Sequence, residues 1–216
     1  MTDNRPAPTV TSLLAELHAY RVQTMAPAAL AANVDQRRLL EETADRDAFV
    51  KAGDVVEPFT LPEVLGGTVD LDQLLADGPV VLLFFRFAGC PACNISLRHY
   101  QQELYPALAE LGAALVAVSP QVPGKLAAIK NRYGFLFPVA SDTGSELGRR
   151  FGITFSPTHD LRAELGTGTS ELPMPTVVVI DANRVVRFAD VHPDWLVRTE
   201  ADAVIDAVRA LVQVPA

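Results

Sequence analysis

The sequence predicts an α/β fold with a central mixed β-sheet flanked by helices. Two continuous apolar runs of strand length, at residues 80–87 and 113–119, are each followed by a helical pattern. A β-hairpin, with strands at 176–180 and 184–191, and a final helix close the chain. Alternating strands and helices indicate parallel pairing, and the hairpin adds an antiparallel part.

Residues 1–50 read as a helical N-terminal extension, and residues 51–216 as the main domain. Apolar residues recur near helical spacing at Leu13, Leu14, Leu17, Tyr20 and Val22. Thr11 or Ser12 is the expected N-cap of this first helix. A second, highly charged helix is expected over residues 30–49. The favoured interpretation is a solvated extension packed on the domain, and the alternative is a dimer-forming arm.

Several local signals define the elements of the domain. The run at 80–87 is continuously apolar, which predicts a strand buried on both faces. Pro58 restricts its segment to a short edge strand, and Asp142 or Thr143 should cap a short helix. In chain order, the other expected elements are an edge strand within 55–61, a glycine turn at 66–67 that leads into 68–71, helices at 71–76, 91–111 and 125–133, a strand within 135–140, a helix at 145–151, an irregular loop at 156–173 and a helix at 199–212.

Composition narrows the function classes. The 216 residues are 49% hydrophobic, which supplies a sizeable core, and carry a net charge of -8. Excess negative charge argues against nucleic acid or an anionic membrane as the main partner. No secretory signal is seen at the start of the sequence, and no apolar run approaches the roughly 20 residues that span a bilayer. We expect a cytoplasmic protein.

The most specific motif is Cys-Pro-Ala-Cys at residues 90–93, which contains the only two cysteines. It follows a buried strand and opens a helix, where unpaired N–H groups favour a thiolate. Pro91 suits the first helical position, because it needs no N–H there. We expect Cys90 to be the more acidic and more exposed thiol, and Cys93, one turn later, to attack an oxidised Cys90.

A metal site is the weaker interpretation of the cysteine pair. Structural zinc takes four ligands, usually as two close pairs, and no two of the four histidines are spaced as a pair. Arg86 interrupts the apolar strand four residues before Cys90. It either extends out from a strand edge into solvent or stabilises the thiolate and orients a peroxide oxygen, and the sequence leaves both interpretations open.

The chain resembles the thioredoxin fold. The strand at 80–87, the cysteine motif and the helix after it are similar to the thioredoxin active-site unit. Residues 174–176, Met-Pro-Thr, resemble the segment whose cis-proline faces the cysteines in that superfamily. This resemblance implies a thioredoxin-like fold and a cis peptide bond before Pro175.

Within that superfamily the chain resembles the peroxiredoxin-like branch of the alkyl hydroperoxide reductase and thiol-specific antioxidant (AhpC/TSA) family. The segments that carry the resemblance are 53–62, 116–120, 137–142, 147–152, 179–187 and 191–195 with Arg198 and Glu200. It implies an antioxidant enzyme in which Cys90 reduces a peroxide and becomes a sulfenic acid. Cys93 then resolves it to an intrachain disulfide, which a thioredoxin-type or low-molecular-weight thiol reduces. No metal or organic cofactor is implied.

Two positions depart from the family pattern. Phe87 stands where peroxiredoxins carry a threonine, and Pro175 stands where they carry an active-site arginine. Arg86 and the hydroxyl of Thr176 are the candidates to replace these groups. The departures keep two alternatives open. One is a thiol-disulfide oxidoreductase acting on protein disulfides. The other is a redox-sensing binding module that uses the N-terminal arm and changes its oligomeric state between the oxidised and reduced forms. A homodimer is a candidate state of the protein.

Overall fold

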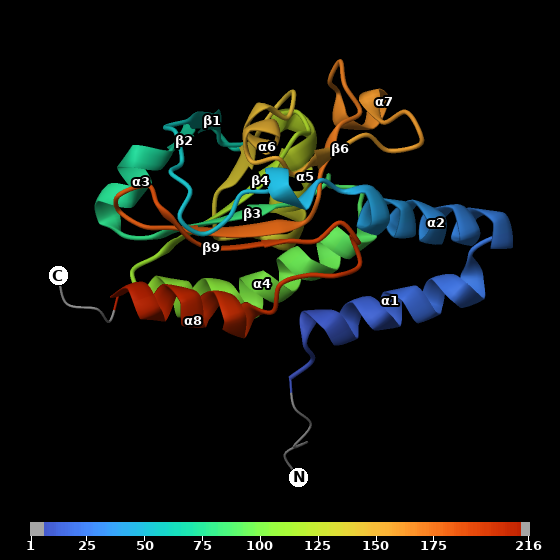
Figure 1. Cartoon of the computed structure of the whole chain (residues 1–216), viewed down its shortest axis with the longest axis horizontal. Coiled ribbons are helices and arrows are strands. Elements are labelled where there is room, and N and C mark those ends of the chain that lie inside the picture. Colours follow the sequence, from blue (N-terminus) through green and yellow to red (C-terminus); the bar gives the residue numbers. More distant parts are fainter. Residues whose placement is uncertain (1–6, 213–216) are drawn as a thin grey trace, which may run out of the picture.

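The computed structural model describes residues 7–212, and a five-stranded mixed sheet lies at the centre of the molecule (Figure 1). The strands, in the spatial order β5-β4-β3-β8-β9, are Val139–Ser141 (β5), Ala114–Ser119 (β4), Val80–Phe84 (β3), Thr176–Ile180 (β8) and Val186–Val191 (β9). β3, β4 and β5 are parallel, whereas β8 is antiparallel to both β3 and β9. The predicted mixed sheet is confirmed.

Both faces of the sheet are covered. Alternate residues of β3 enter two different apolar clusters: Val81 and Leu83 on one face, and Leu82 and Phe84 on the other. The helices that contribute to the first cluster are α1 (Val10–Thr24), α4 (Pro91–Glu110), α5 (Pro123–Tyr133) and α8 (Ala201–Val212). Those on the opposite face are α3 (Leu71–Asp77) and α6 (Glu146–Arg150). Because each side chain of β3 meets a covered face, the strand reads as continuously apolar.

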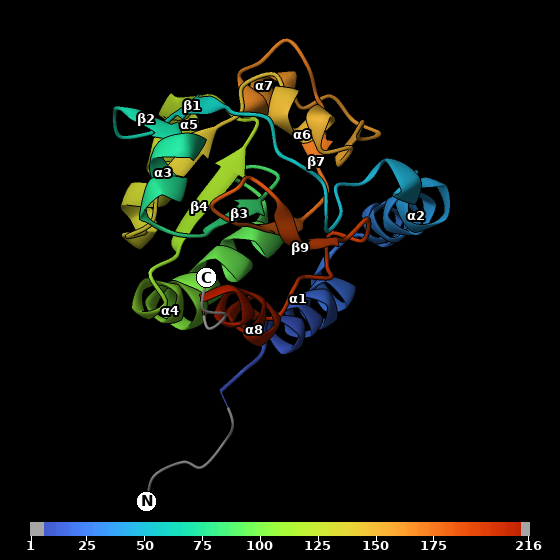
Figure 2. The ribbon, with the colours of Figure 1, turned by 60° about the vertical axis from the view of Figure 1, so that its left-hand side comes forward.

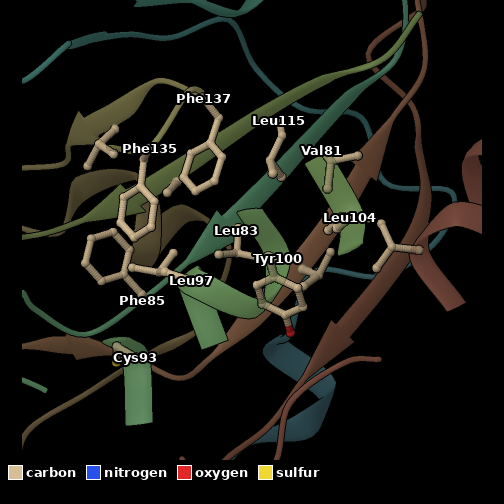
Figure 3. Close-up of a cluster of buried hydrophobic side chains, with 14 of the residues drawn as sticks. Val81, Leu83, Phe85, Cys93, Leu97, Tyr100, Leu104, Leu115, Phe135 and Phe137 are labelled. Atoms are coloured by element: carbon tan, nitrogen blue, oxygen red, sulfur yellow. The ribbon is translucent and has the colours of Figure 1, made fainter. Parts of the chain in front are cut away.

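The first cluster leads directly to the cysteine motif. Figure 3 shows aromatic and aliphatic side chains from the sheet and from α4 packed together, with Cys93 at the edge of the group below Phe85. Phe135 and Phe137 stack with their ring centroids 5.0 Å apart. The start of α4 is therefore held by a packed core, which fixes the position of the motif.

Two helices precede the sheet. α1 (Val10–Thr24) lies beside α4, with its first turn near the start of α8, and α2 (Pro27–Thr43) turns back at one end of the molecule (Figures 1 and 2). The N-cap of α1 is Thr9, whose hydroxyl accepts from the Ser12 N–H, so the expected cap at Thr11 or Ser12 is wrong. The second predicted helix ends at Thr43, and a short 3-10 turn, η1 (Arg46–Ala48), follows an extended break.

The smaller elements complete the fold. β1 (Thr60–Pro62) and β2 (Thr68–Asp70) form an antiparallel pair, as do β6 (Thr154–Phe155) and β7 (Leu172–Pro173). The N-cap position of α6 is Ser145, but the Asp142 carboxylate accepts hydrogen bonds from the N–H groups of Leu147 and Gly148, so an expected residue does bind the free donors of this helix. No helix within residues 7–212 combines the length and apolarity needed to cross a membrane.

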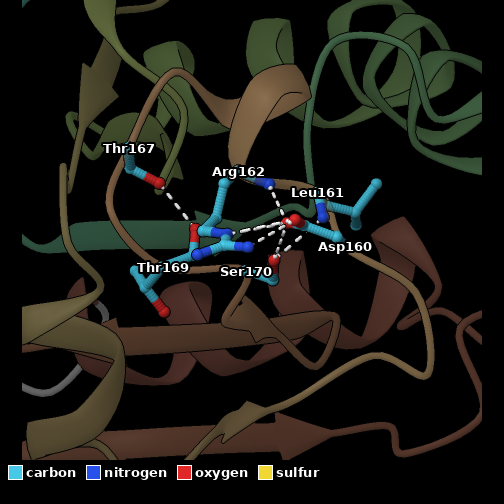
Figure 4. A network of polar contacts seen from close by, with 6 residues as sticks. All are labelled: Asp160, Leu161, Arg162, Thr167, Thr169 and Ser170. Carbon is cyan, nitrogen blue, oxygen red and sulfur yellow. Dashed lines mark hydrogen bonds and ion pairs between the residues drawn. The ribbon is translucent and has the colours of Figure 1, made fainter.

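The segment at 156–173 is more ordered than the predicted irregular loop. It contains the short helix α7 (Arg162–Leu165) and a polar network around Asp160 (Figure 4). Asp160 accepts from the guanidinium of Arg162 and from the hydroxyl of Ser170 at 3.0 Å. These contacts, the Arg162 hydrogen bond first, hold the pKa of Asp160 below its usual range. Local side-chain hydrogen bonds replace the missing periodic pattern here.

Candidate active site

Cys90 stands at the junction between the sheet and α4. It is the N-cap of that helix, and its sulfur accepts from the N–H of Cys93 at 3.3 Å. Pro91 is the first residue of α4 and is exposed, in the position that the sequence predicts. The Cys90 sulfur is therefore held at the positive end of a 20-residue helix.

The two sulfurs lie close together and both are buried. Cys93 Sγ is 2.7 Å from Cys90 Sγ, and the residues are 0% and 3% exposed. Cys90 is the more exposed of the two, as expected, but the difference is small, because both cysteines belong to the apolar cluster beneath the sheet. A disulfide needs a sulfur–sulfur distance of about 2.05 Å, so only a small approach separates the thiols from that bond.

The pair holds one proton between its two sulfurs. Burial raises the pKa of Cys93, but the hydrogen bond with Cys90 and the charges of Arg198 and Arg86 outweigh it and lower that pKa to about 5. Burial, the same hydrogen bond and the negative charge of Cys93 raise the pKa of Cys90 well above its usual value. The expected order of acidity is therefore reversed, because an arginine lies beside the inner sulfur.

That arginine is Arg198. In the sequence it stands out only as part of the last segment that resembles the AhpC/TSA family. It is 8% exposed, and its Nη2 lies 3.8 Å from Cys93 Sγ. Nη1 donates to the carbonyl oxygens of Trp195 and Val197, which fixes the guanidinium beside the sulfur. Its contact with Cys93 joins residues 105 positions apart in the chain, and no local motif signals such a contact.

Arg86 is buried, which rules out the first of its two interpretations. Its exposure is 7%, so the residue does not extend into solvent from a strand edge. The guanidinium carbon lies 4.4 Å from the ring centroid of Trp195 and 5.6 Å from that of Phe87. Among the described residues, Arg86 Nε has no hydrogen-bond partner. Aromatic faces thus hold this cation, and its charge lowers the pKa of both cysteines.

Pro175 and Thr176 line a small cavity beside Cys93 and Arg198, with a volume of about 10 Å³, close to the size of one water molecule. The expected cis bond is wrong: the peptide bond before Pro175 is trans, which suits a chain that runs extended from β7 into β8. The Thr176 hydroxyl donates to the Met174 carbonyl at 2.9 Å, so toward the cavity it can only accept.

His192 lies on the same cavity and was not singled out from the sequence. Its Nε2 lies 2.9 Å from Asp190 Oδ2, and that oxygen also accepts from the Thr199 hydroxyl at 3.0 Å. The hydrogen bond from His192 is the main cause that lowers the pKa of Asp190. Within residues 7–212, no three His, Cys, Asp or Glu side chains gather in a way that could hold a metal ion.

Comparisons with known proteins agree with this geometry. The family model described as AhpC/TSA matches residues 52–189. A candidate peroxiredoxin of Mycobacterium tuberculosis is 31% identical over 75% of this chain and 98% of its own length. The crystal structure of the peroxidoxin BcpB from that organism aligns with a TM-score of 0.62 and 30% identity, over 75% of this chain and 98% of its own.

A relative of a second kind is the thiol-disulfide oxidoreductase ResA of Halalkalibacterium halodurans. It is 32% identical over 57% of this chain and 68% of its own length. Together the family match, which spans more than half of the chain, and the M. tuberculosis relatives establish what the cysteine geometry indicated. The chain belongs to the AhpC/TSA family and has the thioredoxin-like fold of the peroxiredoxins.

Proposed function

We propose that this thiol-dependent oxidoreductase reduces peroxides, with Cys90 as the attacking sulfur and Cys93 as the resolving sulfur. The observation that carries the proposal is the buried pair of sulfurs 2.7 Å apart, which shares one proton beside two buried arginines. A thiolate is the nucleophile in such chemistry, and this pair provides one at neutral pH.

The first step requires the negative charge on Cys90. Moving the shared proton across the short sulfur–sulfur distance places it on Cys93, and the N–H of Cys93 then supports the Cys90 thiolate. The Cys90 sulfur attacks one peroxide oxygen, the oxygen–oxygen bond breaks, and the leaving alkoxide takes a proton to become an alcohol. Arg86 and Arg198 supply positive charge near the oxygen that departs.

The second step closes the disulfide. Cys93 attacks the Cys90 sulfenic acid, the sulfur–sulfur bond forms, and hydroxide leaves and is protonated to water. An external dithiol then supplies two electrons and two protons to restore both thiols. A thioredoxin-type protein or a low-molecular-weight thiol fits this role, because the pair needs no further redox group.

Stopped-flow peroxide consumption with the reduced wild type, Cys90→Ser and Cys93→Ser tests the proposal. The wild type should react much faster than free cysteine, and Cys90→Ser should lose this reaction. Cys93→Ser should consume one peroxide per chain and then stop in the absence of added thiol. If Cys90→Ser keeps the fast step and Cys93→Ser loses it, the two roles are reversed. A wild-type rate equal to that of free cysteine would sink the peroxidase proposal.

A second candidate is a thiol-disulfide oxidoreductase that acts on protein disulfides. The two-residue spacing of the cysteines, the relative named ResA and the presence of Phe87 and Pro175 at the two departing positions favour it. Insulin reduction by the reduced protein separates the candidates, since a peroxidase of this type should be slow with that substrate. Fast insulin reduction with slow peroxide turnover would make this the main activity.

The cytoplasm is part of the same proposal, because two cysteines three positions apart form a redox pair instead of a structural disulfide framework. We also keep the division at residue 50 and a homodimer formed through the arm as predictions. Sedimentation of the oxidised and reduced protein checks the homodimer. The same experiment tests the redox-sensing alternative, which requires the oligomeric state to change with oxidation.

A further inference from the structure

The small cavity beside Cys93 has four residues on its wall that can carry a charge. They are Cys93, Tyr100, His192 and Arg198, and among the described residues no Asp or Glu lines it. Its volume of about 10 Å³ is enough for one water molecule. Cys93 is fully buried, so a proton that leaves its sulfur has no direct contact with solvent. The cavity is the place where such a proton can be received.

Closure of the disulfide requires Cys93 to lose a proton. In the proposed reaction the shared proton moves to Cys93 before Cys90 attacks, and an oxidised Cys90 can no longer take it back. Burial raises the pKa of Cys93, and the hydrogen bond with Cys90 is the first effect that lowers it, so oxidation of Cys90 disfavours the Cys93 thiolate. A base beside Cys93 would restore the nucleophile for the second step.

His192 is the group on the cavity that can act as this base. Arg198 is a permanent cation and accepts no proton. The Tyr100 hydroxyl donates to a backbone carbonyl at 2.6 Å, and burial raises the pKa of Tyr100 above its usual value. An imidazole takes up and releases a proton in the neutral range. The remaining polar side chains on the wall are alcohols, which do not accept a proton at neutral pH: Ser96, Thr176 and Thr199.

Asp190 holds the His192 ring in the form that a base requires. Nε2 of the ring lies 2.9 Å from Asp190 Oδ2, and the same oxygen accepts from the Thr199 hydroxyl at 3.0 Å. The hydrogen bond with His192 lowers the pKa of Asp190, so this carboxylate is ionised at neutral pH and can only accept. Nε2 therefore carries the hydrogen, and the lone pair of Nδ1 remains free to accept from water.

His192 also reaches solvent. Its side chain is 19% exposed, whereas Cys93 on the same cavity is fully buried. The backbone N–H of His192 donates to the Pro175 carbonyl at 2.9 Å, which fixes the residue at the wall of the cavity. A side chain that meets both the cavity and solvent can carry a proton between them.

We propose that His192, oriented by Asp190, accepts the Cys93 proton through one water molecule in the cavity and passes it to solvent. Cys93 Sγ gives its proton to the water while the water gives one to His192 Nδ1. The Cys93 thiolate then attacks the Cys90 sulfur, the sulfur–sulfur bond forms, and the group on Cys90 leaves with its electron pair. The part of this relay in peroxide turnover rests on the proposed function, whereas the proton transfer serves any disulfide exchange at the pair.

A chromogenic disulfide tests the relay without a peroxide. Dithiobis(nitrobenzoate) should form a mixed disulfide with Cys90 and release one nitrothiobenzoate, at a rate proportional to its concentration. Cys93 should then attack the mixed disulfide and release a second one, at a rate independent of that concentration. Nitrothiobenzoate leaves as an anion, so the second release needs only the removal of the Cys93 proton. We expect His192→Gln to slow the second release about 100-fold and to leave the first unchanged.

Matched variants separate a proton relay from a structural role. His159→Gln is the control, because His159 is exposed on the loop before α7 and does not line the cavity. Free imidazole should restore part of the second release to His192→Ala and leave the wild type unchanged. A second release as fast in His192→Gln as in the wild type overturns the relay, as does a slow His192→Ala that imidazole does not accelerate.

Asp190→Asn tests the orienting carboxylate. The amide can donate to the ring, so Nδ1 no longer has to be the atom with the free lone pair, and the second release should slow as well. An Asp190→Asn variant with the wild-type second release removes Asp190 from the relay.

The same variants treated with hydrogen peroxide separate the relay from the proposed function. His192→Gln should keep the fast peroxide reaction and accumulate the Cys90 sulfenic acid, which dimedone traps. Normal peroxide turnover with an unchanged second release overturns the relay and leaves the proposed function standing. A second release that depends on His192, in a protein that does not react with peroxide, overturns the proposed function and leaves the relay standing.

Discussion

Cys90 and Cys93 lose their two protons at widely separated pH values. The charges of Arg198 and Arg86 favour the first loss, and the resulting negative charge opposes the second. We predict that thiolate absorbance of the reduced protein rises in one step near pH 5, with no second step at the usual thiol pKa of about 8.5. Arg198→Met should move the first step to higher pH, and Arg198→Lys should restore part of it. Two steps near pH 8.5 in the wild type would contradict the prediction.

The lowered pKa of Cys93 also makes the stability of the folded protein depend on pH. The pKa of Cys93 is about 5 in the folded protein and about 8.5 in an unfolded chain, so its thiolate stabilises the folded state fully above pH 8.5. This contribution is lost as the pH falls toward 5. Cys90 adds no slope between pH 5 and about 7.5, because it is protonated in both states there. Urea unfolding of the reduced protein should therefore show a loss of stability from about pH 7.5 to 5 that Cys93→Ser lacks. Equal slopes would contradict it.

For individual residues of the site, the sequence predicted the positions of Cys90, Pro91 and Cys93, but not the side chains that surround them. Local reasoning assigned acidity from the helix terminus alone and therefore favoured Cys90. Arg198 reverses the order from the far end of the chain, and its contact depends on how the last loop packs. His192 escaped notice for the same reason, since only the folded sheet brings it to the cavity.

Among the connecting elements, the turn after α6 sits against the end of the extension. Gly152 has φ +68°, and a Cβ there would lie 2.0 Å from the Ala48 carbonyl oxygen, next to the backbone hydrogen bond from Val50 to Phe151. Gly152→Ala should cost about 1–2 kcal/mol for the left-handed backbone. It should cost about 1–3 kcal/mol more for the displaced segment. Denaturant unfolding measures the total.

Gly134 provides the matched control for this prediction. It ends α5 with φ +63°, and a Cβ added there meets nothing within 4 Å. Gly134→Ala should show only the backbone cost of about 1–2 kcal/mol. Equal losses in the two variants would mean that the approach of Ala48 to Gly152 contributes nothing to stability.

Element prediction succeeded where periodicity was strong and failed where tertiary contacts decide. The apolar runs that became β3 and β4 were recognised because both faces of the sheet are covered. The order within 156–173 depends on contacts of Asp160 that have no period, and it was missed. The family resemblance suggested a cis bond before Pro175, but the extended path from β7 into β8 carries a trans bond.

Across the whole molecule, Glu200 ties the first helix to the last. Its carboxylate accepts from the N–H groups of Val10 and Thr11 at 3.1 and 3.0 Å, which satisfies two free donors at the start of α1. Glu200→Gln should weaken this contact and cost about 0.5–2 kcal/mol, as for loss of a helix cap. Amide hydrogen exchange should rise in the first turn of α1. Glu103→Gln, at an exposed position of α4, is the control, and equal exchange in the two variants would contradict the role of Glu200.

The sequence predicted the architecture of the central sheet more fully than it predicted how the N-terminal helices pack on the rest of the molecule. Alternating strands and helices with a closing hairpin are local patterns, and they define the mixed sheet. The packing of α1 beside α4 rests on few buried residues, Val10 and Leu14, and α2 is tied to the domain by long-range polar contacts such as that of Arg37 with Asp194. Such contacts leave no pattern in the chain, so the place where the arm packs against the domain could not be predicted from the sequence.

Arg21, in the last turn of α1, should affect the redox equilibrium of the cysteine pair. The reduced pair carries a negative charge that attracts this arginine, whereas the disulfide carries none. The arm should therefore hold more tightly to the reduced protein, and by reciprocity it should make the disulfide a stronger oxidant. Equilibration against glutathione should give Arg21→Gln a more negative reduction potential than the wild type. A helix that precedes the central sheet in the chain would in this way set the driving force for the chemistry of the cysteine pair.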